Sequence, residues 1–197
     1  MTRTEPPAPE EGPILERLAA EGYEVESLAE LRHSGIRYRK AIPVLVDALN
    51  SSVEPKTLME VVRALSVPWA KPSAVPGLID LFAVVDDPNE LGLRWAVGNA
   101  LDVTWDDAYF DHLAQLARER SYGRGREMLV LGLGRSKRPE AGTLLIELLD
   151  DPTVNGHAVK ALGKLTIPEA RAGLEQMTGD SRTWVRKAAA RALAKLD

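Results

Sequence analysis

Apolar residues recur every three to four positions along most of the chain, a spacing that places them on one face of an α-helix. In the segment WVRKAAARALAKL, the residues that share such a face are Val185, Ala189, Leu193 and Leu196. Turn-forming clusters such as DDPNE, DDPTV and GDSRT separate the helical stretches. The pattern predicts an all-α chain of short amphipathic helices.

From about residue 38 onward, this pattern repeats. One kind of helix ends in a small residue followed by an anchor leucine, and the anchors are Leu65, Leu101, Leu133, Leu162 and Leu193. The other kind carries an apolar cluster around Leu45, Leu78, Leu113, Leu145 and Leu174. Two helices in a period of about 30 residues indicate a repeat array in which neighbouring hairpins share one core. We therefore expect an α-solenoid (superhelix) of about five helical hairpins over residues 38–197.

The two ends of the chain differ from the repeats. Residues 1–12 are rich in proline and glutamate, which predicts a disordered tail. Residues 13–37 contain two short helical stretches that stop at Gly22 and Gly35, and we expect them to cap the array. The last helix, which runs through Leu196, has no partner helix after it. It either serves as a polar cap or mediates self-association.

The segments DDPTVNGHAVKALGKLTIPEARAGLEQM and GDSRTWVRKAAARALAKL resemble the HEAT-repeat family, in the short bacterial form that is also seen in phycobilin-lyase-like proteins. The resemblance covers roughly residues 38–197. It implies a scaffold that binds a protein partner, without specifying a chemical activity. It also implies that helices of the IPVLVDAL type line the concave face of the array.

Composition narrows the choice of partner and compartment. The chain of 197 residues has a net charge of -4 and contains no cysteine. This charge provides no overall basic field that would attract nucleic acid or an anionic membrane, and the lack of cysteine excludes disulfides and thiolate metal sites. The N-terminal segment lacks the apolar core of a signal peptide, and no apolar run approaches the ~20 residues of a membrane span. We expect a cytoplasmic protein with a protein partner.

The segment RSYGRGREMLVLGLGRSK, residues 120–137, has the composition of a phosphate-binding loop. However, Gly132 occupies the position of Ala161 in the repeat, which makes it a small packing residue. Gly134 is then a C-cap. The glycines thus lie at a helix C-terminus, which is the wrong end of the helix dipole for an anion. We interpret the segment as a repeat helix flanked by charged turns.

Candidate chemistry is sparse elsewhere in the sequence. The histidines are scattered, at His33, His112 and His157, and we expect no metal site and no cofactor. The adjacent Asp106 and Asp107 suit a helix-capping cluster better than an acid–base pair. The alternative is a lyase-like or DNA-glycosylase-like enzyme, or a nucleic-acid binder, centred on Trp105, Asp106 and Tyr109. The low overall basicity argues against that alternative.

Two features are candidate partner-binding sites. Trp69 and Trp105 occupy the same place in consecutive repeats, so stacking would put both indoles on one edge, beside Asp106 and Tyr109. The alternative is that both rings seal the turn between repeats. The second feature is a polar, mostly acidic row on the presumed concave face, either a binding surface or a solvated one. The row consists of Asp47, Asp80, Gln115, Glu147 and Gln176.

An arginine seven residues before the anchor leucine recurs in the repeats, at Arg94, Arg126 and Arg186. Turn carboxylates such as Asp87 and Asp180 lie just before it. We expect these arginines to bridge to turn aspartates of neighbouring repeats and so to fix the stacking angle.

Overall fold

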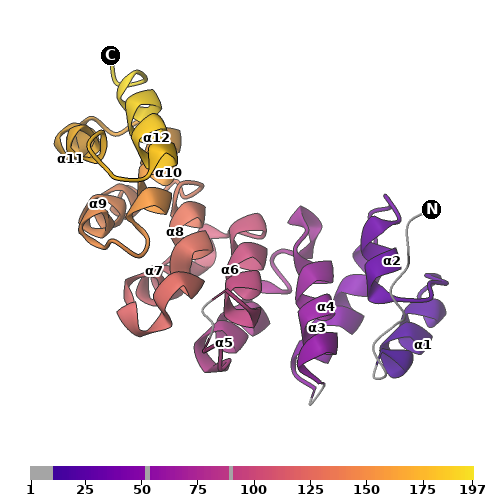
Figure 1. The fold of residues 1–197 in the computed structure, drawn as a ribbon. Coiled ribbons are helices and arrows are strands. Elements are labelled where there is room, and N and C mark those ends of the chain that lie inside the picture. Colours follow the sequence, from indigo (N-terminus) through magenta and orange to yellow (C-terminus); the bar gives the residue numbers. More distant parts are fainter. Residues whose placement is uncertain (1–10, 52–53, 89–90) are drawn as a thin grey trace.

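The computed structural model describes residues 11–51, 54–88 and 91–197, and these residues form helices and no strands (Figure 1). The predicted disordered tail, residues 1–12, falls mostly outside the described residues. The α-helices are α1 (Gly12–Ala20), α2 (Leu28–His33), α3 (Ile42–Leu49), α4 (Pro55–Leu65), α5 (Val75–Val84), α6 (Leu93–Val103), α7 (Phe110–Arg118), α8 (Glu127–Leu133), α9 (Glu140–Glu147), α10 (Asn155–Leu165), α11 (Arg171–Met177) and α12 (Thr183–Leu193). The predicted all-α class is thus confirmed.

The helices pair into five successive hairpins: α3–α4, α5–α6, α7–α8, α9–α10 and α11–α12. Proline in the first turn starts α1, α3, α4 and α5, where its missing N–H costs nothing. Helices α1 and α2 lie at the N-terminal end, where α1 packs on α3 and α2 packs on α4. The α-solenoid prediction is therefore confirmed. The last helix differs from the expectation, because α12 is the second helix of a hairpin and packs against α11.

The core is one continuous layer between the two rows of helices. All but one of the ten repeat leucines named above are at most 1% exposed. The exception is Leu193 in α12, which is half-buried. Each hairpin thus depends on its neighbours for a dry interior, as expected for a repeat array.

The array curves, and the even-numbered helices α4 to α12 line the inner side of the curve (Figure 1). They also pack more closely on each other than the odd-numbered helices do. Small residues permit this approach: a Cβ on Gly134 would lie 2.8 Å from the Ala161 Cα, and one on Gly163 would lie 3.2 Å from the Ala192 Cβ. The expectation that helices of the IPVLVDAL type line the concave face is therefore wrong, since α3 and its equivalents form the outer row.

The predicted arginine bridges form in one of the three cases. The Arg126 guanidinium is 1% exposed and pairs with Asp151 of the following repeat at 2.9 Å. Arg94 instead donates to the backbone carbonyls of Phe82, in α5, and of Val85, just after that helix. Arg186 donates to carbonyls in the turn between α11 and α12. Asp87 accepts from the backbone amide of Arg94 and so caps the start of α6. Arg94 and Arg186 therefore stabilise turns within their own hairpins.

Candidate functional site

Trp105 lies inside the array and is 6% exposed. Its ring packs on Gly132, where a Cβ would come within 2.7 Å of the indole. The indole N–H donates to the Asp107 carboxylate at 2.9 Å. That carboxylate also accepts from the Ser136 hydroxyl at 2.6 Å and from the Lys137 amide at 2.8 Å. Trp105 and Asp107 thus join the α6–α7 connection to the loop that follows α8.

The ring of Trp69 packs on another aromatic residue of the repeat before it. Its partner is Tyr38, edge-on, with ring centroids 5.5 Å apart. The Tyr38 hydroxyl donates to the Ala64 carbonyl at 2.8 Å, and burial raises the pKa of Tyr38 to about 12, despite an opposing effect of the positive charge of Arg32. Both tryptophans therefore serve packing between repeats. Partner binding through Trp69 and Trp105 stays a prediction. Because Trp105 is buried, little of its surface is accessible to a partner.

The carboxylates next to Trp105 have structural partners. Asp106 caps the 3-10 turn Asp107–Tyr109, accepting from the Ala108 amide at 3.0 Å. Burial raises the pKa of Asp107, but the hydrogen bonds from Ser136, Lys137 and Trp105 outweigh it and hold that pKa below its usual range. Tyr109 is half-buried against the core. The arrangement matches a capping cluster in which both carboxylates accept structural hydrogen bonds.

The polar row lies on the outer helices, and its members Asp47, Asp80, Gln115, Glu147 and Gln176 are all exposed. Two of its carboxylates already pair with arginines. Asp47 is 2.7 Å from Arg17, and Glu147 is 3.5 Å from Arg118. The row is therefore on the convex side and is partly neutralised.

The glycine-and-arginine segment forms no anion cradle. Residues Arg120–Arg126 make 3-10 turns, α8 follows, and Gly134 is the C-cap of α8. The arginines in and beside this segment each pair with a carboxylate: Arg118, Arg120, Arg124, Arg126, Arg135 and Arg138. The local excess of arginine is thus largely neutralised, with Arg120 and Arg126 sharing Asp151, and the interpretation as a repeat helix with charged turns is supported.

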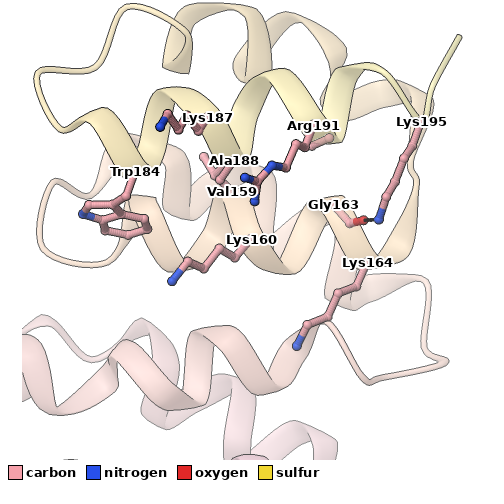
Figure 2. A pocket seen from close by; sticks show the side chains of 10 residues that line it. Val159, Lys160, Gly163, Lys164, Trp184, Lys187, Ala188, Arg191 and Lys195 are labelled. Atoms are coloured by element: carbon pink, nitrogen blue, oxygen red, sulfur yellow. Dashed lines mark hydrogen bonds between the residues drawn. The ribbon is translucent and has the colours of Figure 1, made fainter.

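A different basic cluster lies on the inner face, between α10 and α12. A cavity of about 330 Å³ opens there, and Figure 2 shows the side chains that line it. We call it the α10–α12 groove, and its basic residues are Lys160, Lys164, Lys187, Arg191 and Lys195. Val159, Gly163, Ala188 and Ala192 form the apolar part of its wall, and Trp184 lies at one end.

The cations of the α10–α12 groove lack the carboxylate partners that the arginines of α7 and α8 have. No acidic residue lines the groove, and among the described residues none of its five cations forms an ion pair with a carboxylate. The Lys195 ammonium donates to the Gly163 carbonyl at 2.6 Å. Burial and the nearby charges of Arg135 and Lys160 lower the pKa of Lys164, against the opposing effect of Asp102. The groove therefore carries uncompensated positive charge.

Trp184 marks the end of the groove nearest the start of α12. Its side chain is 40% exposed, which is high for a tryptophan in this chain. The Lys160 ammonium lies 4.4 Å from the ring centroid, a cation–π distance, and the His157 ring lies 5.7 Å away. Burial lowers the pKa of His157, opposed by the negative charge of Glu127. An exposed indole beside a row of cations suits contact with an apolar group on an anionic ligand.

The sequence contains a signal for this groove that is not a recognised motif. Residues 155–165 and 183–193 contain no aspartate or glutamate. Their basic residues recur four apart, as Lys160 and Lys164 on α10 and as Lys187 and Arg191 on α12. Four-residue spacing places them on one helix face. The groove emerges only when the two helices are known to be neighbours on the inner side.

Other kinds of site find no support in the part of the chain that the structure describes. Residues 11–51, 54–88 and 91–197 contain no group of three histidine, aspartate or glutamate side chains placed to hold a metal ion. None of their helices has the length and apolar composition needed to cross a lipid bilayer.

Comparison with known proteins identifies the repeats. A sequence model of HEAT repeats matches residues 110–194, whereas the comparison with curated proteins gives no match. Among solved structures, a designed armadillo repeat protein aligns with a TM-score of 0.55 and 16% identity, covering 96% of each chain. Another designed armadillo repeat protein, in complex with the peptide (KR)4, aligns with a TM-score of 0.61 and 17% identity, covering 96% of this chain and 95% of that one. At such identities the likeness shows the fold alone. The resemblance to HEAT repeats is thus confirmed for residues 110–194, and the chain as a whole is a repeat α-solenoid.

Proposed function

We propose that the protein is a non-enzymatic interaction scaffold that binds a protein partner on the inner face of its even-numbered helices. The observation that carries the proposal is the α10–α12 groove, where cations without carboxylate partners surround an apolar wall and end at an exposed tryptophan. Aromatic side chains that combine apolar area with a polar edge are common at binding hot spots. Repeat solenoids offer extended inner surfaces for such contacts.

The solved neighbours support a peptide as the bound element. One of the two designed armadillo repeat proteins is in complex with the peptide (KR)4, so a solenoid of related shape binds a peptide. That peptide is basic, whereas the α10–α12 groove of this protein is itself basic. We therefore expect peptide binding here with a partner of opposite charge.

We propose the α10–α12 groove as the principal binding surface, in place of the acidic row and the tryptophan pair. The row lies on the outer helices, and Trp105 is buried. Against the enzyme alternative, Asp106 and Asp107 accept capping and cross-linking hydrogen bonds.

Partner recovery from the native host tests the proposal. The tagged chain is compared with Trp184→Ala on the inner face and with Val84→Ala as the control. Val84 ends the outer helix α5 and is 78% exposed, so both substitutions remove an exposed apolar side chain. We expect a protein that is recovered with the unaltered chain and with Val84→Ala but is lost with Trp184→Ala. Recovery of the same proteins with all three chains would contradict the proposal.

Self-association through the C-terminal helix stays a separate prediction. The groove side of α12 is basic, so two copies meeting symmetrically on that side would place like charges opposite each other. Any dimer is therefore expected to use another side of α12. Sedimentation at several protein concentrations tests this, and a strict monomer would rule out self-association.

A further inference from the structure

The α10–α12 groove also indicates what kind of segment it binds. We infer that the groove takes an acidic protein segment in extended conformation, with its carboxylates along the basic rows and an apolar side chain against Trp184. The inference rests on the proposed function, since it specifies the partner for the same surface.

Charge is the first argument. Around α7 and α8, in contrast, the arginines are matched by carboxylates, as with Arg118 and Glu147 or Arg138 and Glu140. In the groove, the chain supplies cations and no carboxylate. Like charges held together on one surface repel each other, and a bound anion relieves that repulsion. The ligand therefore has to bring the carboxylates that the chain lacks.

Spacing is the second argument. Residues four apart on a helix are separated by about 6 Å along the axis, and this is the interval between Lys160 and Lys164 and between Lys187 and Arg191. Alternate residues of an extended chain point to the same side and lie about 6.6 Å apart. An extended segment with acidic residues at alternate positions can thus match the basic rows on both helices. Figure 2 shows Arg191 placed between the two helices, where such a segment would lie.

The two ends of the groove differ, which orients the segment. Near Trp184, the exposed indole gives the groove its large apolar surface, and the neighbouring Glu127 carboxylate is already paired with Arg124 at 2.9 Å. At the other end, Arg191 and Lys195 have no acidic neighbour in the groove. The carboxylates of the segment therefore belong toward Arg191 and Lys195, and its apolar residue belongs at Trp184.

A nucleic acid fits the surface less well. Its phosphates continue in both directions, so a bound strand would leave the two-helix groove and follow the inner face. Next to the groove, the arginines of α8 and its flanking turns are already paired with carboxylates, as Arg124 is with Glu127 and Arg135 is with Asp102. A short acidic segment ends before those carboxylates. The net charge of -4 for the whole chain also disfavours a polyanion longer than the groove.

Fluorescence anisotropy with synthetic probes tests the inference. The first probe is a labelled peptide of about eight residues that alternates glutamate with serine and ends in leucine; the others replace glutamate with lysine, or leucine with serine. A thymidine oligonucleotide of equal charge is the nucleic-acid probe. We expect the glutamate–leucine peptide to bind most tightly, with affinity that falls as salt is added. Binding of the oligonucleotide more tightly than this peptide would overturn the inference in favour of nucleic acid.

Matched variants locate the site. Lys160→Glu/Arg191→Glu reverses two groove charges, whereas Arg39→Glu/Lys56→Glu makes the same change in net charge at exposed positions at the other end of the array. We expect the groove variant to weaken binding of the acidic peptide by about tenfold or more and the control to change it by less than about threefold. Lys160→Gln/Arg191→Gln serves as the milder pair, and circular dichroism verifies that each variant is folded. Equal losses in the groove and control variants would overturn the inference.

Trp184→Ala separates the apolar contact from the charge. It should weaken the peptide that ends in leucine and leave the serine-ended peptide unchanged; equal effects on both would overturn that part of the inference. If no acidic probe binds while partner recovery still depends on Trp184, the acidic ligand is wrong and the scaffold proposal stands. If recovery is independent of Trp184, the scaffold proposal itself fails.

Discussion

The buried ion pair between Arg126 and Asp151 links two successive repeats, and its removal should strongly destabilise the array. The guanidinium donates to the Asp151 carboxylate at 2.9 Å and to the carbonyls of Ala117 and Gly123, each at 3.1 Å. Asp151 also accepts from the Thr153 amide at 3.0 Å, at the start of the next hairpin's second helix. Asp151→Ala would leave a buried cation without its counter-charge.

The expected loss of stability in Asp151→Ala depends on the hydrogen-bond acceptors that remain for Arg126. Removing one partner of a buried ion pair costs about 3–5 kcal/mol. Because two carbonyls still accept from the guanidinium, the lower end of about 3 kcal/mol is expected. For a chain of this length, each 1 kcal/mol lowers Tm by about 2–4 °C, so Asp151→Ala should lower Tm by about 6–12 °C. Asp151→Asn keeps an oxygen for the Thr153 amide and should cost less.

A double-mutant cycle separates the ion pair from other effects. Arg126→Met/Asp151→Ala removes both charges, so it should be less destabilised than the sum of the single variants. Thermal unfolding is followed by circular dichroism and by tryptophan fluorescence, and coincident transitions verify that one event is measured. A change in Tm below about 2 °C for Asp151→Ala, or additive effects in the cycle, would refute the view that this pair couples the repeats.

Three further outcomes are expected. Gly134→Val should destabilise the fold by about 1–3 kcal/mol through overpacking, because its Cβ would lie 2.8 Å from the Ala161 Cα; a Tm equal to that of the unaltered chain would contradict the close approach of α8 and α10. Asp107→Ala should cost about 1–3 kcal/mol and change the emission of Trp105, because the indole N–H loses its acceptor; an unchanged emission spectrum would argue against this. The free energy of unfolding should fall on acidification below about pH 4. Hydrogen bonds outweigh burial at Asp107 and Asp151 and lower the pKa of each carboxyl in the folded state. Their contribution to stability is therefore present above the unfolded-state pKa and is lost as pH falls. Urea unfolding at several pH values measures this, and a midpoint that does not change between pH 6 and pH 3 would contradict it.

The fold was predictable because its signals are local and are repeated. The anchor leucines recur with the period of a hairpin, and each is flanked by turn residues that end the helix. Alignment of Gly132 with Ala161 also led to the correct interpretation of the glycine-rich segment, since repeats place equivalent residues in equivalent contacts. Gly132 packs against Trp105 in the structure. The hairpin boundaries were less clear, because spacing alone does not say which of two neighbouring helices begins a unit.

The candidate site was predicted poorly because exposure depends on contacts that are distant in sequence. Trp69 and Trp105 recur at one position, which indicates a common role but not whether that role is binding or packing. Trp184 is the tryptophan that lies beside the α10–α12 groove. No other repeat has a tryptophan at the equivalent position, so the repeat alignment did not draw attention to it. The five groove cations lie on α10, on α12 and in the turn just after α12, and α11 separates the two helices in sequence. Their convergence therefore follows only from the stacking of α10 on α12.

The inner and outer rows of helices could in fact have been assigned from residue size. On a curved array the inner arc is shorter, so inner helices approach each other more closely and need smaller side chains at their contacts. The helices with small residues before the anchor leucine, such as Ala161 in α10 and Ala192 in α12, meet this condition. The row of α3 has some small buried residues, such as Ala48, but it also carries larger ones such as Val44 and Leu45 at its buried positions. Applied before any family resemblance, this rule places the basic helices α10 and α12 on the inside, and it thereby directs attention to their exposed charges rather than to the acidic row outside.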